Sequence, residues 1–483
     1  MSRLLNRYRS LSVQARAAFW FLISGFIQKG ISSITTPIFT RLMSTEEYGQ
    51  FGVFNSWLGI VSVFVTLNLY LGVYSQGLVK FSDERPMFIS SLAGLVSAMT
   101  AAYTAVYIVF HQFFNSLFHL TTVQVLAMLL ISWTSSIFNF WAEEQRVLYK
   151  YQALIVISLS LCVIKPILCI LLVLHSDDKV TARILGLALI DLIVCTTLFV
   201  LQIKRGKTFF SRKYWLYALK FNLPLLPHYL SGSVLASADR IMIEDMAGAS
   251  KAGIYSLAYS AAIIMGIFGG AMMQTISPWI YTRIKEKQIG DIGPKMYSTL
   301  LIVGAVNLLM ILFGPEVIRI FAPPEYYEAI WTIPPVAMSV YFSYSYDLFA
   351  KFAFYHEKTF FIMIASVIAA ALNVLLNYLM IPAFGYIAAG YTTLICYIIY
   401  TAAHYCFMCK VCRENCDGIM PYRIKTLLLI TSVFLAVGLI FTFTYYNTWI
   451  RYAVLFAMLA VCLYFRKKIT EIVSSVITLK KTQ

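Results

Sequence analysis

Charged residues are scarce in this chain of 483 residues, because Asp, Glu, Lys and Arg together make up only 12% of it. Soluble globular proteins average roughly 25%, so the composition excludes a protein whose whole surface faces water. Acidic residues are the scarcer sign, with 22 Asp and Glu against 38 Lys and Arg. Hydrophobic residues make up 60% of the chain, and these proportions favour an integral membrane protein.

Long apolar segments recur along the whole chain. A segment of about 20 apolar residues is needed to cross about 30 Å of hydrocarbon. Backbone groups inside lipid must be bonded within each segment, so we predict an all-α membrane protein with about 14 transmembrane helices. The predicted spans are 15–37, 51–74, 87–110, 121–141, 152–174, 182–203, 221–243, 254–280, 296–321, 329–350, 359–381, 385–408, 424–446 and 449–465.

Basic residues are unequally divided between the two sets of loops that alternate along the chain. With residues near span ends counted with the adjacent loop, the set on the amino-terminal side holds 29 of the 38 Lys and Arg, the other set holds 7, and Lys29 and Lys165 lie deep within spans. Because basic residues next to a span resist translocation, we expect the richer set and both termini in the cytoplasm. The net charge of +16 then reflects topology and attraction to anionic lipid headgroups, and we expect no nucleic-acid partner.

A weak internal repeat appears at an offset of 204 residues. It pairs Gly49 with Gly253, Glu143 with Asp347 and Gly186 with Gly390, each at corresponding spans. Six spans per copy is an even number, so the copies share one orientation in the membrane. We therefore predict two six-helix lobes related by duplication and a two-helix appendage. The predicted parts are an N-lobe with an amphipathic N-terminus (1–203), a basic cytoplasmic linker (204–220), a C-lobe (221–409), and the appendage with a basic cytoplasmic tail (410–483).

Three charged residues fall near the middle of predicted spans. Lys29 lies in the first span, Lys165 in the fifth and Asp191 in the sixth. A lysine at mid-bilayer costs about 2.5–3.5 kcal/mol, so each must face protein or water. Lys29 either lines a cavity or forms a structural ion pair. Lys165, next to the helix-bending Pro166, either binds an anionic ligand or forms a bridge with Asp191, which in turn is a candidate for a coupling proton or sodium ion.

Further polar residues mark the seventh span. Pro224 and Pro227 predict a break in the helix near the cytoplasmic side, which allows a hinge. His228 either titrates near neutral pH or bonds a carbonyl that the prolines release. Asp239 and Arg240, near the outer end, are either a gate pair or interfacial residues.

Two acidic residues, Glu143 and Asp347, occupy the inner ends of the fourth and tenth spans. The inner ends of spans meet water, so simple solvation accounts for charges there. An inner gate is the more specific hypothesis.

Four cysteines, Cys406, Cys409, Cys412 and Cys416, have the spacing that bacterial ferredoxins use around iron–sulfur clusters. The proline that usually follows is replaced by Asp417, and the first two cysteines fall on a membrane helix rather than on a wrapping loop. We interpret them as reduced cytosolic thiols, and we expect neither a metal nor a cofactor.

Several stretches resemble the Wzx-type oligosaccharide flippases of the multidrug/oligosaccharidyl-lipid/polysaccharide (MOP) exporter superfamily. They are Pro37-Ile-Phe-Thr-Arg-Leu-Met-Ser-Thr-Glu-Glu-Tyr-Gly49, Asp239-Arg240-Ile-Met-Ile, Ala252-Gly253-Ile-Tyr255-Ser-Leu-Ala-Tyr259, and Phe384-Gly385 through Gly390. The resemblance implies alternating access in a bacterial cytoplasmic membrane. It also implies an undecaprenyl-pyrophosphate-linked oligosaccharide as substrate, destined for a surface polysaccharide. Polysaccharide polymerase machinery is an implied partner.

The resemblance assigns provisional roles to the polar residues already described. Lys29, Lys165 and Arg240 would hold the pyrophosphate, with His228 as a further candidate for substrate binding. Asp191, Asp239, Glu143 and Asp347 are the candidates for coupling or gating.

Two other functions remain open. A multidrug or organic-cation antiporter of the same superfamily needs an acidic cavity, which the mid-membrane lysines disfavour. A membrane glycosyltransferase or glycan polymerase would need carboxylates such as Glu46 and Glu47, but acidic residues at a helix start more often complement the helix dipole. The outer loops, short even at their longest near 243–253 and 314–328, also leave such an enzyme little room.

Overall fold

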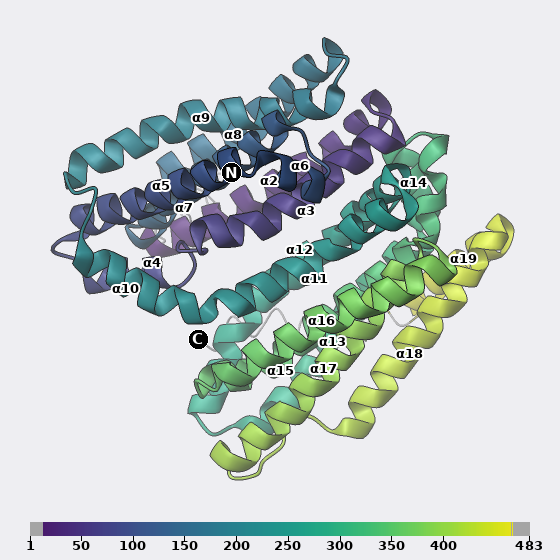
Figure 1. Cartoon of the computed structure of the whole chain (residues 1–483). Helices are drawn as coiled ribbons and strands as arrows, with labels where there is room; N and C mark the ends of the chain where they lie inside the picture. The colour runs from purple at the N-terminus through teal and green to yellow at the C-terminus, as the bar shows by residue number, and fades with distance from the viewer. Residues whose placement is uncertain (1–12, 465, 467–483) are drawn as a thin grey trace, which may run out of the picture. The chain divides into compact units, whose positions relative to one another are not determined.

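The structure, a computed structural model, describes residues 13–464 and 466, and these are almost entirely helical (Figure 1). The predicted amphipathic N-terminus and most of the basic tail lie outside the described residues. The chain folds as two compact units, Met1–Ser237 and Ala238–Gln483, called unit 1 and unit 2 below. The division falls within a helix, α11 (Leu226–Ala247).

Unit 1 contains the helices that precede this division. They are α2 (Val13–Leu42), α3 (Thr45–Thr66), α4 (Val73–Lys80), α5 (Arg85–Val109), α6 (His111–Phe118), α7 (Thr122–Val147), α8 (Tyr151–Leu174), α9 (Lys179–Gly206), α10 (Arg212–Asn222), the 3-10 turn η1 (Leu223–Leu225) and the first half of α11. Its aromatic core gathers where α4, α5, α7 and α10 meet, and there the Tyr74 ring stacks on Phe140 with centroids 4.4 Å apart.

Unit 2 begins in the second half of α11. Its further elements are α12 (Ala249–Lys285), η2 (Ile289–Asp291), α13 (Ile292–Leu312), α14 (Gly314–Phe321), η3 (Pro324–Trp331), α15 (Ile333–Tyr355), α16 (Thr359–Phe384), α17 (Ala388–Asn415), α18 (Ile424–Phe443), η4 (Thr444–Tyr446) and α19 (Thr448–Tyr464). The last two long helices pack within this unit. Arg451 of α19, only 2% exposed, pairs with Glu316 of α14, and the Tyr445 hydroxyl bonds the Ile311 carbonyl.

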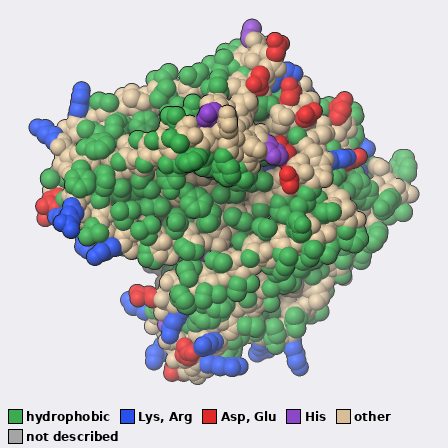
Figure 2. Space-filling model, in the orientation of Figure 1, with side chains coloured by type: hydrophobic (Ala, Val, Ile, Leu, Met, Phe, Trp, Pro, Cys, Tyr) green, Lys and Arg blue, Asp and Glu red, His purple; other side chains and the backbone are tan. Residues whose placement is uncertain are grey.

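Each of the 14 predicted spans overlaps a long helix, so the predicted all-helical membrane fold is confirmed. The predicted spans 51–74 and 296–321 were too long, because α3 ends at Thr66 and α13 at Leu312. Ten of the described helices are both long and apolar enough to cross a membrane. The other four predicted spans are α2, α11, α15 and α19. The lower hydropathy of α15 follows from its burial, because most of its residues pack inside unit 2 and do not face lipid. Hydrophobic side chains cover most of the visible surface, and charged ones gather near helix ends (Figure 2).

Side-chain caps fix where two of the spans begin. Ser44 and Glu47 form a reciprocal capping box at α3, in which the Ser44 amide donates to the Glu47 carboxylate at 2.7 Å. Thr121 and Gln124 do the same at α7. Such boxes satisfy amides that a helix start leaves unbonded. Glu47, one of the two carboxylates considered for an enzyme, therefore has a structural use here.

The second span is interrupted on its way to α4. Leu67 and Asn68 adopt left-handed backbone angles, with φ of 49° and 47°, and end α3. The buried Asn222 side chain, at the end of α10, donates to the Leu67 carbonyl at 2.8 Å. Directly after Asn222 the chain passes through η1, which contains Pro224, so the break predicted at the start of the seventh span is confirmed. The buried Asn222 side chain thus links the break after α3 to the break between α10 and α11.

Helical structure occupies much of the predicted linker 204–220, because α9 runs to Gly206 and α10 starts at Arg212. The linker is fastened to the start of α5, where Lys213 lies 2.5 Å from the Glu84 carboxylate. The Tyr214 hydroxyl donates to the same carboxylate. These two donors, Lys213 first, hold the pKa of Glu84 below its usual range.

Replacing Asn222 should loosen the joint between these interruptions. We expect Asn222→Ala to destabilise the protein by about 1–3 kcal/mol, because the buried Leu67 carbonyl loses its donor. Thermal unfolding of the purified protein in detergent measures the change. Asn415→Ala is the matched control, since Asn415 is exposed and bonds only within its own helix. Equal melting temperatures for both variants would contradict the role assigned to Asn222.

Candidate functional site

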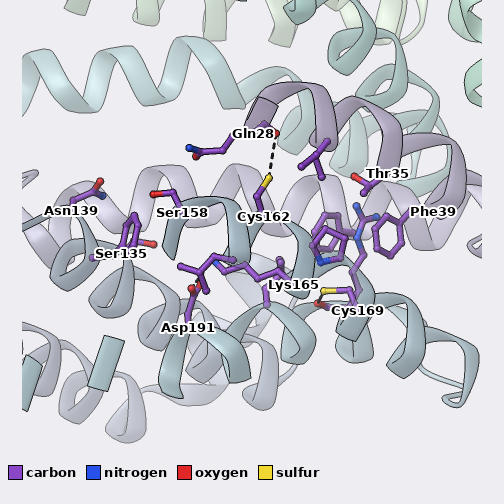
Figure 3. A pocket seen from close by; sticks show the side chains of 17 residues that line it. Gln28, Thr35, Phe39, Ser135, Asn139, Ser158, Cys162, Lys165, Cys169 and Asp191 are labelled. Carbon is purple, nitrogen blue, oxygen red and sulfur yellow. Dashed lines mark hydrogen bonds and ion pairs between the residues drawn. The ribbon is translucent and has the colours of Figure 1, made fainter. Parts of the chain in front are cut away.

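A cavity of about 480 Å³ lies inside unit 1, among α2, α3, α7, α8 and α9. It is lined by Gln28, Ile31, Thr35, Phe39, Phe51, Ser135, Phe138, Asn139, Ser158, Leu161, Cys162, Lys165, Pro166, Cys169, Arg183, Leu187 and Asp191. Figure 3 shows many of these side chains pointing into one space from several helices. The cavity combines apolar walls with two cations, one carboxylate and several hydroxyl and amide groups.

The cavity brings together Lys165 and Asp191, two of the residues singled out in the sequence. The Lys165 ammonium lies 2.5 Å from the Asp191 carboxylate, and the two side chains are 26% and 10% exposed. Each residue stands near the middle of its helix, α8 or α9. The ion pair therefore exists, and because both members line the cavity, it does not remove Lys165 from a ligand's reach.

Proline shapes α8 at this point. Pro166 lies inside the helix and has no N–H to bond the carbonyl of Cys162, one turn earlier. The Cys162 thiol itself donates to the Gln28 carbonyl of α2 at 3.5 Å. The interrupted hydrogen bonding leaves polar backbone beside the ion pair.

The α2 wall of the cavity consists of Gln28, Ile31, Thr35 and Phe39, which recur at helical spacing. The Lys29 side chain lies outside the described residues, although its backbone belongs to α2. The placement of Lys29 at the site therefore stays a prediction.

Arg183 is a cavity residue that the sequence analysis missed. It is the fifth residue of α9, and it was grouped with the seven basic residues of the poorer loops. Its Cζ atom lies 3.7 Å from the centroid of the Phe39 ring and 3.6 Å from that of Phe51. The aromatic residues on either side of the turn between α2 and α3, Phe39 and Phe51, were the available signal, because arginine stacks readily on aromatic faces.

In unit 2 a buried polar network surrounds Asp239. Its carboxylate accepts hydrogen bonds from Tyr255 at 2.6 Å, from Thr393 at 2.7 Å and from Asn377 at 2.7 Å. Asn373 donates to Thr393 at 3.0 Å and extends the network. All five side chains are at most 3% exposed. Neutral donors from α12, α16 and α17 thus stabilise a carboxylate at the heart of the unit.

Asp239 and Arg240 have separate surroundings, and a gating role for them stays a prediction. Asp239 points into its network, while the Arg240 guanidinium lies 4.6 Å from the centroid of the Tyr259 ring. Adjacent residues on a helix point about 100° apart, which explains their separate surroundings. No ion pair joins the two among the residues that the structure describes.

The remaining candidates are His228, Glu143 and Asp347. His228, in the first turn of α11, has its ring 6.0 Å from that of Tyr229 and is not among the residues lining the unit 1 cavity. Glu143 accepts hydrogen bonds from Ser75 at 2.7 Å and Arg146 at 3.0 Å. Asp347 pairs with Lys351 at 2.8 Å and lines a separate cavity of about 170 Å³ in unit 2. Gating by these residues stays a prediction.

Three of the four clustered cysteines lie in the last turns of α17, and Cys416 comes directly after its end. Cys406 is exposed, whereas Cys412 and Cys416 are buried, and the Cys416 sulfur lies 3.6 Å from His356 Nε2. Within the described part of the chain, no group of three or more His, Cys, Asp or Glu is arranged to hold a metal ion.

Comparison with known proteins identifies the class of this molecule. The profile of the polysaccharide biosynthesis protein family matches residues 15–282, more than half of the chain. The chain belongs to this family, which confirms the resemblance to oligosaccharide flippases at the level of the family. Among curated relatives, the Lsg locus putative protein 1 of Haemophilus influenzae is 21% identical over 376 residues, covering 73% of this chain and 88% of that protein.

Solved structures with the same fold are transporters. The lipid II flippase MurJ, in an inward closed conformation, aligns with a TM-score of 0.64 and 16% identity over 92% of this chain and 99% of that one. An inward-facing multidrug resistance MATE family transporter of the MOP superfamily gives 0.59 and 11%, covering 81% and 95%. The family and the fold are therefore those of multi-pass membrane transporters and flippases.

The Lys165–Asp191 pair gives a direct test of charge compensation. We expect Lys165→Met to destabilise the protein by about 2 kcal/mol, because the Asp191 carboxylate loses its cation. Adding Asp191→Leu should recover most of that loss, because an apolar pair needs no compensation. Thermal unfolding of both single variants and the double variant completes the cycle. Losses that simply add in the double variant would show that the two groups do not compensate each other.

Proposed function

We propose that this protein moves an undecaprenyl-pyrophosphate-linked oligosaccharide from the inner to the outer leaflet of a bacterial cytoplasmic membrane. A pyrophosphate and a glycan cannot enter hydrocarbon without partners, because burying unpaired charge or polar groups is prohibitively costly. The observation that carries the proposal is the unit 1 cavity, which offers Lys165, hydroxyls and amides to such a headgroup within a bundle of membrane-spanning helices. Membership of the polysaccharide biosynthesis family supports the glycan.

Lys165 is the proposed contact for the pyrophosphate, with Lys29 of the same unit as a further cation. The Asp191 carboxylate competes with the substrate for the Lys165 ammonium, 2.5 Å away. Binding of a phosphoryl group at Lys165 therefore weakens the ion pair, and release of the substrate restores it. In the empty site, Asp191 balances the charge of Lys165. When substrate is bound, the same carboxylate competes for Lys165 and so limits how tightly the substrate binds.

The coupling ion, a proton or a sodium ion, is assigned to Asp239. Its carboxylate lies among the oxygen-bearing side chains of Tyr255, Asn373, Asn377 and Thr393. Sodium prefers oxygen ligands, and rotation of an amide group turns its oxygen toward the carboxylate. A proton would instead neutralise the carboxylate directly. Alternating access then exposes the site first to one side of the membrane and then to the other, with both chain termini in the cytoplasm.

The rival function is export of organic cations. The MATE likeness supports the shared fold, but at 11% identity it carries no information about the substrate. A cavity selective for cations needs an excess of carboxylates, whereas the unit 1 cavity holds Lys165 and Arg183 against Asp191 alone. Charge therefore favours an anionic headgroup.

Complementation tests the headgroup site. In a bacterium that lacks its own oligosaccharide flippase, we expect Lys165→Ala to reduce surface polysaccharide at least tenfold, because the headgroup loses its mid-membrane cation. Lys358→Ala is the control, since Lys358 is half-exposed at a helix end and pairs only with Glu414 at 3.6 Å. Immunoblots verify equal amounts of protein in the membrane. Wild-type polysaccharide in the Lys165→Ala strain would refute the assigned headgroup site.

Transport in proteoliposomes tests the coupling ion. We expect flipping of a fluorescent lipid-linked oligosaccharide to accelerate under either a sodium or a pH gradient, and Asp239→Asn to abolish that dependence. Asp191→Asn should retain the gradient dependence while it alters the apparent affinity for substrate. Gradient dependence that survives in Asp239→Asn and disappears in Asp191→Asn would assign the coupling ion to unit 1 instead.

A further inference from the structure

Three polar side chains of the unit 1 cavity have no hydrogen-bond partner among the described residues. They are Ser135 and Asn139 of α7 and Ser158 of α8, and all three line the cavity. Polar groups inside proteins are nearly always bonded, as Ser132 of α7 is to the Met128 carbonyl at 2.9 Å. A ligand in the cavity can therefore bond all three groups without breaking a contact of the protein.

These three residues, called the polar wall below, lie on one side of Lys165. Ser135 and Asn139 are four residues apart and so share a face of α7. Ser158 precedes Lys165 by seven residues, which is about 10 Å along α8. Figure 3 shows all three on the side of Lys165 opposite to Phe39. Because long side chains on a helix lean toward its N-terminus, the Lys165 ammonium is directed toward the polar wall.

The polar wall consists of uncharged groups. The charged residues that line the cavity are Lys165, Arg183 and Asp191, and none of them belongs to the wall. Hydroxyl and amide groups both donate and accept hydrogen bonds, as the hydroxyls of a sugar do. Phe138, between the two α7 residues, lines the same space and offers an apolar surface to the C–H groups of a sugar ring. The wall therefore suits a neutral pyranose.

We propose that the polar wall binds the first sugar of the substrate, the one joined directly to the phosphoryl group at Lys165, and selects a neutral pyranose. The identity of the substrate rests on the proposed function, but recognition of a sugar phosphate at this wall requires no lipid. The phosphate–sugar bond then follows α8, with the sugar nearer the end of α8 that is expected in the cytoplasm. A carboxylate on the sugar would meet no cation at the wall and would weaken binding.

Sugar 1-phosphates test the wall in the purified full-length protein, without lipid and without transport. Ligand-detected NMR titrations at low ionic strength compare the 1-phosphates of glucose, galactose, N-acetylglucosamine and glucuronic acid with methyl phosphate, which has the same phosphate monoester and no sugar. We expect at least one neutral sugar to bind about tenfold more tightly than methyl phosphate, because several of its hydroxyls gain partners. Glucuronic acid 1-phosphate should gain little.

Substitutions in the wall should remove this gain and leave the phosphate contact intact. We expect Asn139→Leu to weaken the neutral sugar 1-phosphate about fivefold and Ser158→Ala about threefold, with methyl phosphate unchanged in both. Lys165→Ala should weaken every probe, because the phosphoryl group loses its cation. Ser136→Ala is the matched control and should bind all probes as the wild type does. Ser136 is next to Ser135 on α7, but it is buried and does not line the cavity.

Four results would overturn parts of this inference. If no neutral sugar 1-phosphate bound more tightly than methyl phosphate, or if Ser136→Ala lost as much affinity as Ser158→Ala, the wall would not be a sugar site. Ser158→Ala removes a single atom, so wild-type sugar affinity in this variant would refute the wall even if Asn139→Leu failed to fold. Tight binding of glucuronic acid 1-phosphate would refute the selection for neutral sugars. Undiminished affinity in Lys165→Ala would refute the orientation anchored there.

These outcomes are distinguishable from failure of the proposed function. A protein whose sugar affinity falls in Asn139→Leu but which does not restore surface polysaccharide would retain the wall and lose the flippase. A protein that restores polysaccharide, and whose affinity for sugar 1-phosphates is the same with and without the wall substitutions, would retain the flippase and lose the wall.

Discussion

The cost of placing charge inside a membrane governs the arrangement of this protein. Each ionised side chain within the helical units requires compensation, and the described residues supply it in three chemically different ways. Lys165 has a carboxylate, Arg183 has aromatic faces, and Asp239 has a set of neutral donors. These solutions differ in consequence, since an ion pair cancels charge, whereas rings and neutral donors preserve it.

The polar centres of the two units occupy helices of the same rank in each unit. In unit 1 the cavity with Lys165 and Asp191 lies among the helices of the first, fifth and sixth spans, α2, α8 and α9. In unit 2 the Asp239 network draws on the seventh, eleventh and twelfth, α11, α16 and α17, and on α12. If the halves arose by duplication, one ancestral polar position has diverged toward cations in one copy and toward a carboxylate in the other. Such divergence suits a carrier of an anionic headgroup that is coupled to a cation.

Much of this arrangement follows from the sequence, because hydropathy and the cost of charge act locally. The helix positions could be predicted, and so could the pairing of Lys165 with Asp191, since two opposite charges at mid-depth in successive spans need each other. Arg183 was missed because it stands close to a loop, where an arginine ordinarily reaches water. The network around Asp239 was missed for another reason. The network's side chains Asn373, Asn377 and Thr393 are neutral and come from different helices. The composition of a span therefore does not indicate that they will contact the Asp239 carboxylate.

The interruption after α3 was also missed in the sequence, although Asn68 and Gly72 within it are residue types that favour positive φ, and it has a mechanical consequence. The 22 residues of α3 already extend about 33 Å, enough to cross the hydrocarbon without α4. The six residues 67–72 separate α3, which carries Phe51, from α4, so a tilt of α3 need not be transmitted to α4. Ser75 on α4 donates to Glu143 of α7, whereas Phe51 on α3 contacts Arg183 of α9, so the two parts of the predicted second span have different neighbours.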